Sequence, residues 1–158
     1  MDKPRHWAVK STVPLKSGVF LGFDYGECNV GVAVGQGITG TATALETIRV
    51  KRKDDLWAAV ARLVATWKPT AFVVGLSHQE DGSENPITQL TLRFCRQLNG
   101  RFNLPVHTVD ETLTTMESRH VFFQQNPNKS ADFFYHKDQI AAQLILQTWL
   151  SVHNENAE

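Results

Sequence analysis

Hydrophobic residues in the first part of the chain come in short, strand-like runs separated by glycine-containing connections. The runs occupy residues 18–24, 29–36 and 41–50, and each is rich in apolar or β-branched residues. Consecutive strands joined by such short connections pair antiparallel. The pattern therefore predicts three antiparallel strands in chain order.

The pattern then changes to the three- and four-residue spacing of amphipathic helices. One helix is expected from Asp54 to just before Pro69, and a second one ends with Gly100 as its C-cap. An apolar run at 71–76 lies between these helices and another at 105–110 follows the second, so both predict buried strands. Because strands joined through helices run parallel, we expect them to extend the sheet in parallel.

The remainder of the chain is expected to be largely helical. We predict one helix over about 114–125 and another over 137–153, with a polar and aromatic loop at 126–136 between them. The resulting order is βββαβαβα. It predicts an α/β fold, a five-stranded mixed sheet with helices on both faces.

The composition is typical of one globular domain. Of the 158 residues, 42% are hydrophobic and 20% are charged. A chain of roughly 150 residues can bury enough surface to form a sizeable core without disulfides or structural metals. We assign residues 18–153 to a single domain, 1–17 to a flexible N-terminal arm and 154–158 to a disordered tail.

The charge balance and the cysteine count narrow the possible partners. The 16 Lys and Arg residues offset the 16 Asp and Glu residues, which excludes a strongly basic nucleic-acid-binding domain. No apolar run approaches the ~20 residues of a membrane span. The cysteines, Cys28 and Cys95, are too few for a disulfide framework. We expect a cytoplasmic protein without membrane contact, in which any nucleic acid is bound by local groups.

Four carboxylates lie where this topology would bring them together. Asp24 ends the first strand, and Asp138 is at the head of the final helix. Asp110 and Glu111 directly follow the last strand. Each of them alone has an ordinary interpretation as a turn or helix cap. Because sites in α/β sheets form at the carboxyl ends of parallel strands, we expect these side chains to converge at one edge.

Converging carboxylates repel one another unless cations neutralise them. Carboxylate oxygens are hard ligands that suit Mg²⁺ or Mn²⁺. A pair of such ions stabilises both the attacking and the leaving oxygen in phosphodiester displacement. The sequence therefore indicates a metal-dependent phosphodiester hydrolase that holds one or two divalent ions.

Four motifs in the same order resemble the YqgF (RuvX) family. They are GFDYGECNVGVAVGQ, VVGL followed by DG, VDETLTT and KDQIAAQLIL, and together they span nearly the whole chain. The family comprises ribonuclease H-like proteins described as Holliday junction resolvases and as nucleases that mature the 5′ end of pre-16S rRNA. The resemblance implies catalytic and metal-binding roles for Asp24, Glu111 and Asp138, with Asp110 as an auxiliary ligand.

The resemblance also implies a nucleic-acid partner. We expect processing of pre-16S rRNA in ribosome biogenesis, with pre-ribosomal particles as partners, and we keep cleavage of four-way DNA junctions as the alternative. The chain would act as a monomer or a homodimer. A junction offers two equivalent strands, so a symmetric pair suits the second activity.

The chain departs from the family pattern at two places that lose a cation and at a third that loses a proline. Glu27 and Cys28 replace a Thr-Lys or Thr-Arg pair, Thr112 replaces an arginine, and Ser77 stands where a proline is expected. These losses predict a weaker hold on phosphate rather than altered chemistry. They also leave open a non-catalytic nucleic-acid-binding module of the same fold. An actin-like ATPase hairpin is a further alternative, but it would need a second domain.

Several further side chains are candidates for substrate contact. They are Lys51, Arg52, Lys53, His78, Arg93, Tyr135 and His136. The cations could contact phosphates, the tyrosine could stack on an unpaired base, and the histidines could assist proton transfer. The ordinary alternatives are solvated surface for the cations and packing for the tyrosine.

Overall fold

The computed structural model describes residues 18–77, 86–110 and 133–155. The predicted arm at 1–17 and the helix expected over 114–125 lie outside these described residues. No helix in the described part of the chain is both long and apolar enough to cross a membrane.

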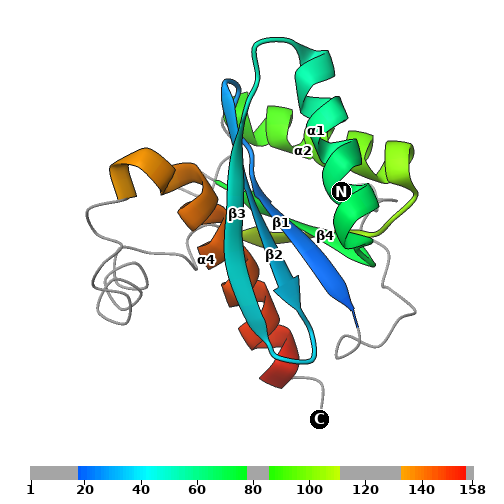
Figure 1. Ribbon diagram of the computed structural model, residues 1–158, viewed down its shortest axis with the longest axis vertical. Helices are drawn as coiled ribbons and strands as arrows, with labels where there is room; N and C mark the ends of the chain where they lie inside the picture. Colours follow the sequence, from blue (N-terminus) through cyan, green and yellow to red (C-terminus); the bar gives the residue numbers. More distant parts are fainter. Residues whose placement is uncertain (1–17, 78–85, 111–132, 156–158) are drawn as a thin grey trace, which may run out of the picture.

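The strands form one mixed sheet, as the hydrophobic pattern predicts (Figure 1). Strands β1 (Val19–Asp24), β2 (Asn29–Gln36) and β3 (Thr41–Arg49) pair antiparallel in chain order. Strand β4 (Ala71–Leu76) pairs in parallel with β1, and β5 (Val106–Asp110) pairs in parallel with β4. The sheet order is β3-β2-β1-β4-β5. The carboxyl ends of β1, β4 and β5 therefore share one edge of the sheet.

Helices α1 (Lys53–Trp67) and α2 (Pro86–Phe102) cover one face of the sheet. The core beneath them is built largely from aromatic rings. The ring of Phe23 in β1 lies 5.5 Å from that of Phe94 in α2 and 5.8 Å from that of Phe72 in β4, between centroids. This packing holds both helices against the centre of the sheet.

Helix α4 (Phe133–Glu155) covers the opposite face and has its own buried cluster. Glycines on the strands let this helix come close to the sheet. A Cβ atom on Gly22 would lie 2.8 Å from the Cβ of Leu146, and one on Gly35 would lie 2.8 Å from the Cδ1 of Leu150. A larger side chain at either position would push α4 away from the strands.

Two glutamines of α4 also fix its position along the sheet. The Gln147 side chain accepts a hydrogen bond from the backbone N–H of Ala42 (3.0 Å) and donates one to the carbonyl oxygen of Gly40 (2.7 Å). Gln143 donates to the carbonyl oxygen of Ala42 (2.9 Å). Edge strands otherwise leave such backbone groups unpaired. The helix therefore supplies hydrogen-bond partners to backbone groups in and next to the edge strand β3. The same bonds fix the position of the helix along this strand.

The final helix is longer than the sequence pattern predicts. It begins at Phe133 rather than Lys137, so the end of the loop expected at 126–136 is helical, and Asp138 lies in the second turn rather than at the head. It ends at Glu155, two residues beyond the predicted domain boundary. No glycine or proline interrupts the segment 133–137, so nothing in it stops the helix from extending towards its N-terminus.

The predicted C-cap of α2 is also wrong. Gly100 lies inside the helix, and Asn103 adopts the left-handed conformation that ends it, with φ of 55°. Asparagine tolerates this conformation because its short polar side chain can bond locally. The extra turn is stabilised by tertiary contacts: Arg101 lies 4.3 Å from the ring centroid of Trp57, and the ring of Phe102 packs on Phe72.

A buried histidine lies between β5 and α4. The ring of His107 lies 4.9 Å from that of Trp149, which in turn stacks on His153 at 4.3 Å. The Nε2 atom of His107 is buried and has no hydrogen-bond partner among the described residues. Burial lowers the pKa of His107 below its usual value of 6.5, and the nearby charge of His153 lowers it further. The folded state therefore favours the neutral imidazole.

This histidine should make the protein less stable in mild acid. As the pH falls below 6.5, His107 becomes protonated in the unfolded chain before it does in the folded protein. Proton binding therefore favours the unfolded state, and the free energy of unfolding falls until the pH reaches the lower pKa of the folded state. His107→Phe removes that titration, and we expect its melting temperature to fall less between neutral and mildly acidic pH. Thermal unfolding of both proteins across this range measures the difference, and equal slopes would contradict the prediction.

Candidate active site

Asp24 lies at the carboxyl end of β1, on the face that α4 covers. Side chains alternate between the two faces of a strand. Phe20 belongs to the α4 cluster, and Gly22 lies against α4, whereas Phe23 belongs to the α1/α2 cluster. The alternation therefore puts Asp24 on the α4 side, where it is half-buried.

The backbone of α4 brings Asp138 to the same place. Asp24 is paired with Gly31 across the antiparallel β1-β2 ladder. A Cβ atom on Gly31 would collide with the backbone carbonyl group of Asp138. Asp138 therefore lies directly over the strand residue that neighbours Asp24, and it is also half-buried. Two residues that are 114 positions apart in the sequence (138 − 24) thus lie at the same sheet edge, with the backbone of Asp138 against the strand partner of Asp24.

Asp110 lies at the same edge but on the other face. Within β5, His107 and Val109 contact the α4 side of the sheet. Asp110 is paired with Leu76, a member of the α1/α2 cluster. The β5 ladder therefore separates Asp110 from the α4 face that carries Asp24. Its role as an auxiliary metal ligand stays a prediction.

The remaining predicted ligand, Glu111, lies outside the described residues, and so does His78. Tyr135 and His136 lie in the first turn of α4, but their side chains are also outside the description. Within the described part of the chain, no group of three or more His, Cys, Asp or Glu side chains is placed to hold a metal. Asp24 and Asp138 carry oxygen donors of the kind that Mg²⁺ and Mn²⁺ prefer, and their role as metal ligands stays a prediction.

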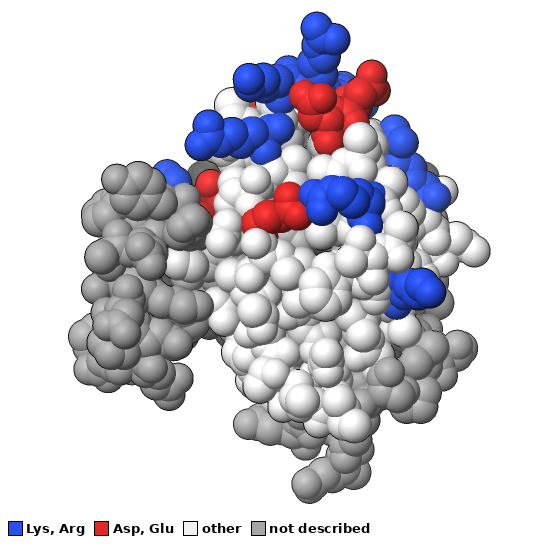
Figure 2. Space-filling model, in the orientation of Figure 1, with Lys and Arg blue, Asp and Glu red and all other residues white. Residues whose placement is uncertain are grey.

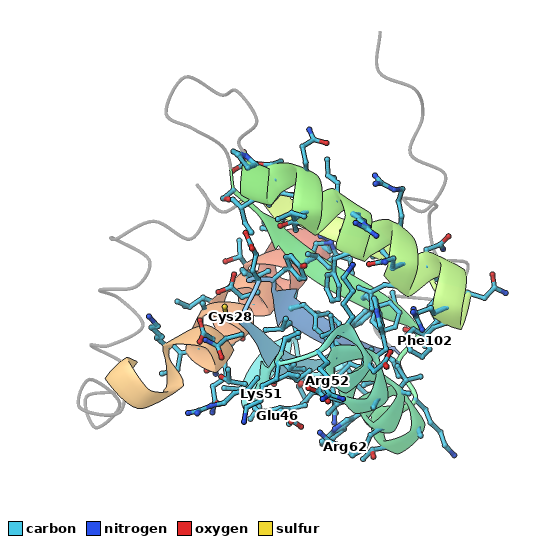
Figure 3. The ribbon with its side chains drawn as sticks, turned by 90° about the horizontal axis from the view of Figure 1, so that it is seen from above. Cys28, Glu46, Lys51, Arg52, Arg62 and Phe102 are labelled. Atoms are coloured by element: carbon cyan, nitrogen blue, oxygen red, sulfur yellow. The ribbon has the colours of Figure 1, made fainter. Side chains whose placement is uncertain are left out.

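The predicted basic run lies at the top edge of the molecule, where β3 leads into α1. Figure 2 shows Lys and Arg side chains gathered there, with acidic side chains next to them. Lys51, Arg52 and Lys53 are all exposed. The backbone N–H of Val50 donates to the carbonyl oxygen of Cys28 (2.8 Å), which joins this connection to the β1-β2 turn. Seen from above, Cys28 lies on the same side of the molecule as Lys51 and Arg52 (Figure 3).

A pocket of about 220 Å³ lies beside this edge, and sequence reasoning missed most of its lining. The lining residues that bear on function are Tyr25, Glu27, Lys53, Trp57, Arg93 and Gln97. Only Lys53 and Arg93 were predicted as contacts. The position of Tyr25 could have been inferred, because it directly follows Asp24 and strand alternation sends it to the opposite face.

Charges converge on Tyr25 in this pocket. Burial raises the pKa of its phenol, the carboxylate of Glu27 raises it further, and the guanidinium of Arg93 opposes them. The phenol therefore stays protonated at neutral pH and keeps its hydroxyl donor. Glu27, which replaces a neutral residue of the family pattern, contributes to the pocket rather than only to the solvent-exposed turn.

The sheet order and the helices on both faces define a ribonuclease H-like fold. Two solved structures share this fold. A Thermus thermophilus RuvC structure superposes with a TM-score of 0.53 at 15% identity and covers 87% of this chain and 96% of that one. The fowlpox virus resolvase in complex with substrate Holliday junction DNA superposes with a TM-score of 0.54 at 15% identity. The match covers 85% of this chain and 98% of that one.

The chain belongs to the RuvX family, whose model, described as Holliday junction resolvase, matches residues 18–152. A Methylococcus capsulatus relative is 61% identical over 87% of this chain and 91% of its own length. A Pseudomonas putida relative is 45% identical over 85% of this chain and 96% of its own length. Both carry the name "Putative pre-16S rRNA nuclease". The family, the relatives and the fold make this chain a nuclease-type hydrolase.

Proposed function

We propose that this protein is a divalent-metal-dependent nuclease whose catalytic carboxylates are Asp24, Glu111 and Asp138. The observation that carries the proposal is the close approach of the Asp138 backbone to Gly31, which is the strand partner of Asp24. Carboxylates brought to one sheet edge repel each other less when a cation lies between them. The pairing therefore favours a bound Mg²⁺ or Mn²⁺.

The third ligand, Glu111, is proposed from the family resemblance, and β5 bears only on Asp110. His107 and Val109 face the α4 side, whereas Asp110 is on the other side. The family resemblance supports Glu111 as the ligand, with Asp110 in an auxiliary role.

The protein residues in this site position the reacting groups. When bound, divalent ions activate the attacking water and stabilise the leaving oxygen in phosphodiester hydrolysis. Asp24 is held by strand β1 and Asp138 by helix α4. Gln143 and Gln147 fix the position of that helix along the sheet. The carboxylates are therefore preorganised before metal or substrate binds.

The proposed substrate is the 5′ region of pre-16S rRNA, processed in the cytoplasm on pre-ribosomal particles. The names of the Methylococcus and Pseudomonas relatives support this choice. Holliday junction cleavage is the second candidate, because the family description and the fowlpox structure both refer to junctions. We also infer that one domain, residues 18–153, carries the activity, because the family match covers 18–152.

A cleavage panel tests this function. Pre-16S leader RNA, a four-way DNA junction and single strands of both are incubated with the protein and Mg²⁺ or Mn²⁺. We expect cleavage of the leader RNA that stops when the ion is chelated and resumes when it is restored. Preferred cutting of the junction would favour the second candidate. Tight binding without cleavage under any metal would refute catalysis and favour the non-catalytic module.

A further inference from the structure

The pocket at the β1-β2 turn has aromatic walls that are held in place without a ligand. We call it the Tyr25 pocket, after the residue that lies next to Asp24. The Tyr25 ring stacks on Phe94 with 4.8 Å between centroids and 24° between planes. Trp57, only 8% exposed, stacks on the same ring at 5.7 Å. Because neighbouring side chains already fix these rings, a ligand would not need to order them on binding.

The rim of the Tyr25 pocket is polar and carries two cations. Lys53 comes from the start of α1, and Arg93 comes from the exposed side of α2. Glu27 and Gln97 add hydrogen-bond acceptors and an amide donor. An aromatic wall next to cations, with groups that can bond a base edge, is the combination that single-stranded nucleic acids require.

The Tyr25 pocket lies at the same end of β1 as Asp24, but on the opposite face of the sheet. Tyr25 follows Asp24 in the sequence, but it packs against the α1/α2 cluster, whereas Asp24 lies on the α4 side. The end of β1 therefore separates the two sites by the thickness of the sheet. A strand that crosses this edge could present a phosphodiester to Asp24 and a neighbouring base to Tyr25.

We propose that the Tyr25 pocket receives one unpaired nucleotide of the strand that the nuclease cuts. The base lies against Tyr25 and the edge of Trp57, and its phosphate is bound by Lys53 and Arg93. Glu27 and Gln97 bond the polar edge of the base. The proposal rests on the proposed nuclease function and identifies a single-stranded segment next to the cleavage site as part of the substrate.

Fluorescence of a base analogue tests the pocket without relying on catalysis. A short single-stranded RNA carrying 2-aminopurine at one position is titrated with the protein while metal is chelated, and the label is moved along the strand. We expect quenching at one position, because stacking quenches this base. Tyr25→Leu should relieve the quenching and weaken RNA binding by about 10-fold, as loss of one stacked base does. Tyr25→Phe keeps the ring and should retain most of both signals.

The two arginines on the exposed side of α2 provide a matched control. Arg93 lines the Tyr25 pocket, whereas Arg96 is also exposed, lies about one turn further along and is not part of the lining. Arg93→Gln should weaken binding several-fold more than Arg96→Gln. Equal losses in the two variants, or quenching that Tyr25→Leu leaves unchanged, would overturn the proposal.

A free nucleotide presents the same base and phosphate as a nucleotide within a strand. Adenosine monophosphate alone is therefore titrated into the wild type and Tyr25→Leu. We expect only weak binding of the free nucleotide. Binding tighter than that of the RNA would overturn the proposal and indicate a site for a small nucleotide.

The result remains interpretable if the nuclease function itself fails. Position-specific quenching together with the Arg93 and Arg96 difference, in a protein that cuts nothing, would uphold the pocket and refute the catalytic proposal. Metal-dependent cleavage with no difference between these variants would refute the pocket alone.

Discussion

Asp24→Asn is expected to reduce metal-dependent cleavage by at least about 100-fold, because loss of even an outer partner of a metal ligand costs about 10- to 100-fold. The asparagine retains the shape of the side chain but loses the negative charge that would hold the ion. The fold should be intact, because Asp24 is half-buried at the end of its strand. Single-turnover cleavage of the preferred substrate, with melting temperature as the folding check, measures both effects.

A matched substitution separates the site effect from a general loss of charge. Asp54 is an exposed carboxylate in the first turn of α1, away from the α4 face. Asp54→Asn should leave cleavage within about two-fold of wild type, because surface charges contribute little to local interactions. Wild-type cleavage by Asp24→Asn would contradict the catalytic assignment. An equal loss in Asp54→Asn would also contradict it.

Gly31→Ala should have the second large effect, because no side chain fits between β2 and α4 at this position. The new Cβ would collide with the backbone carbonyl group of Asp138, so the helix must shift. Overpacking of this kind destabilises a protein by about 1–3 kcal/mol. A displacement near 1 Å at a catalytic group can reduce the rate by about 100-fold. We therefore expect cleavage to fall much more than stability does.

Another glycine provides the control for this substitution. A Cβ on Gly100 would have no atom within 4 Å, and this glycine lies inside α2. Gly100→Ala should therefore stabilise the protein by about 0.5–1 kcal/mol through helix propensity and leave cleavage unchanged. Urea unfolding and single-turnover kinetics compare the two variants. Full activity in Gly31→Ala would mean that the position of Asp138 against β2 is not needed for catalysis.

The secondary structure follows closely from the sequence because each element has a clear hydrophobic period. The apolar runs at 18–24 and 29–36 became β1 and β2, and the run at 71–76 became the fully buried β4. Short connections impose antiparallel pairing, and helical crossovers impose parallel pairing. The five-stranded mixed sheet was therefore predictable from local pattern and chain connectivity.

The helix ends were less predictable because tertiary contacts determine them. Gly100 is the residue that local rules choose as a C-cap, yet α2 continues to Phe102, where contacts with Trp57 and Phe72 stabilise another turn. Likewise, the sequence contains no signal that separates the end of the predicted loop from the start of α4 at Phe133. Such packing joins residues far apart in the chain, so the local sequence pattern does not contain its energy.

The sequence by itself determined the fold class, the family resemblance and the residue types available for metal chemistry. It also placed Asp24 and Asp110 at strand ends, because strand boundaries are a local property. Only the tertiary structure decided which carboxylates share a face. The backbone of Asp138 lies against Gly31, the strand partner of Asp24, because a glycine there lets α4 approach β2, whereas the β5 ladder puts Asp110 on the other side. Distance in space depends on how helices pack on the sheet, and that packing involves residues far apart in the chain.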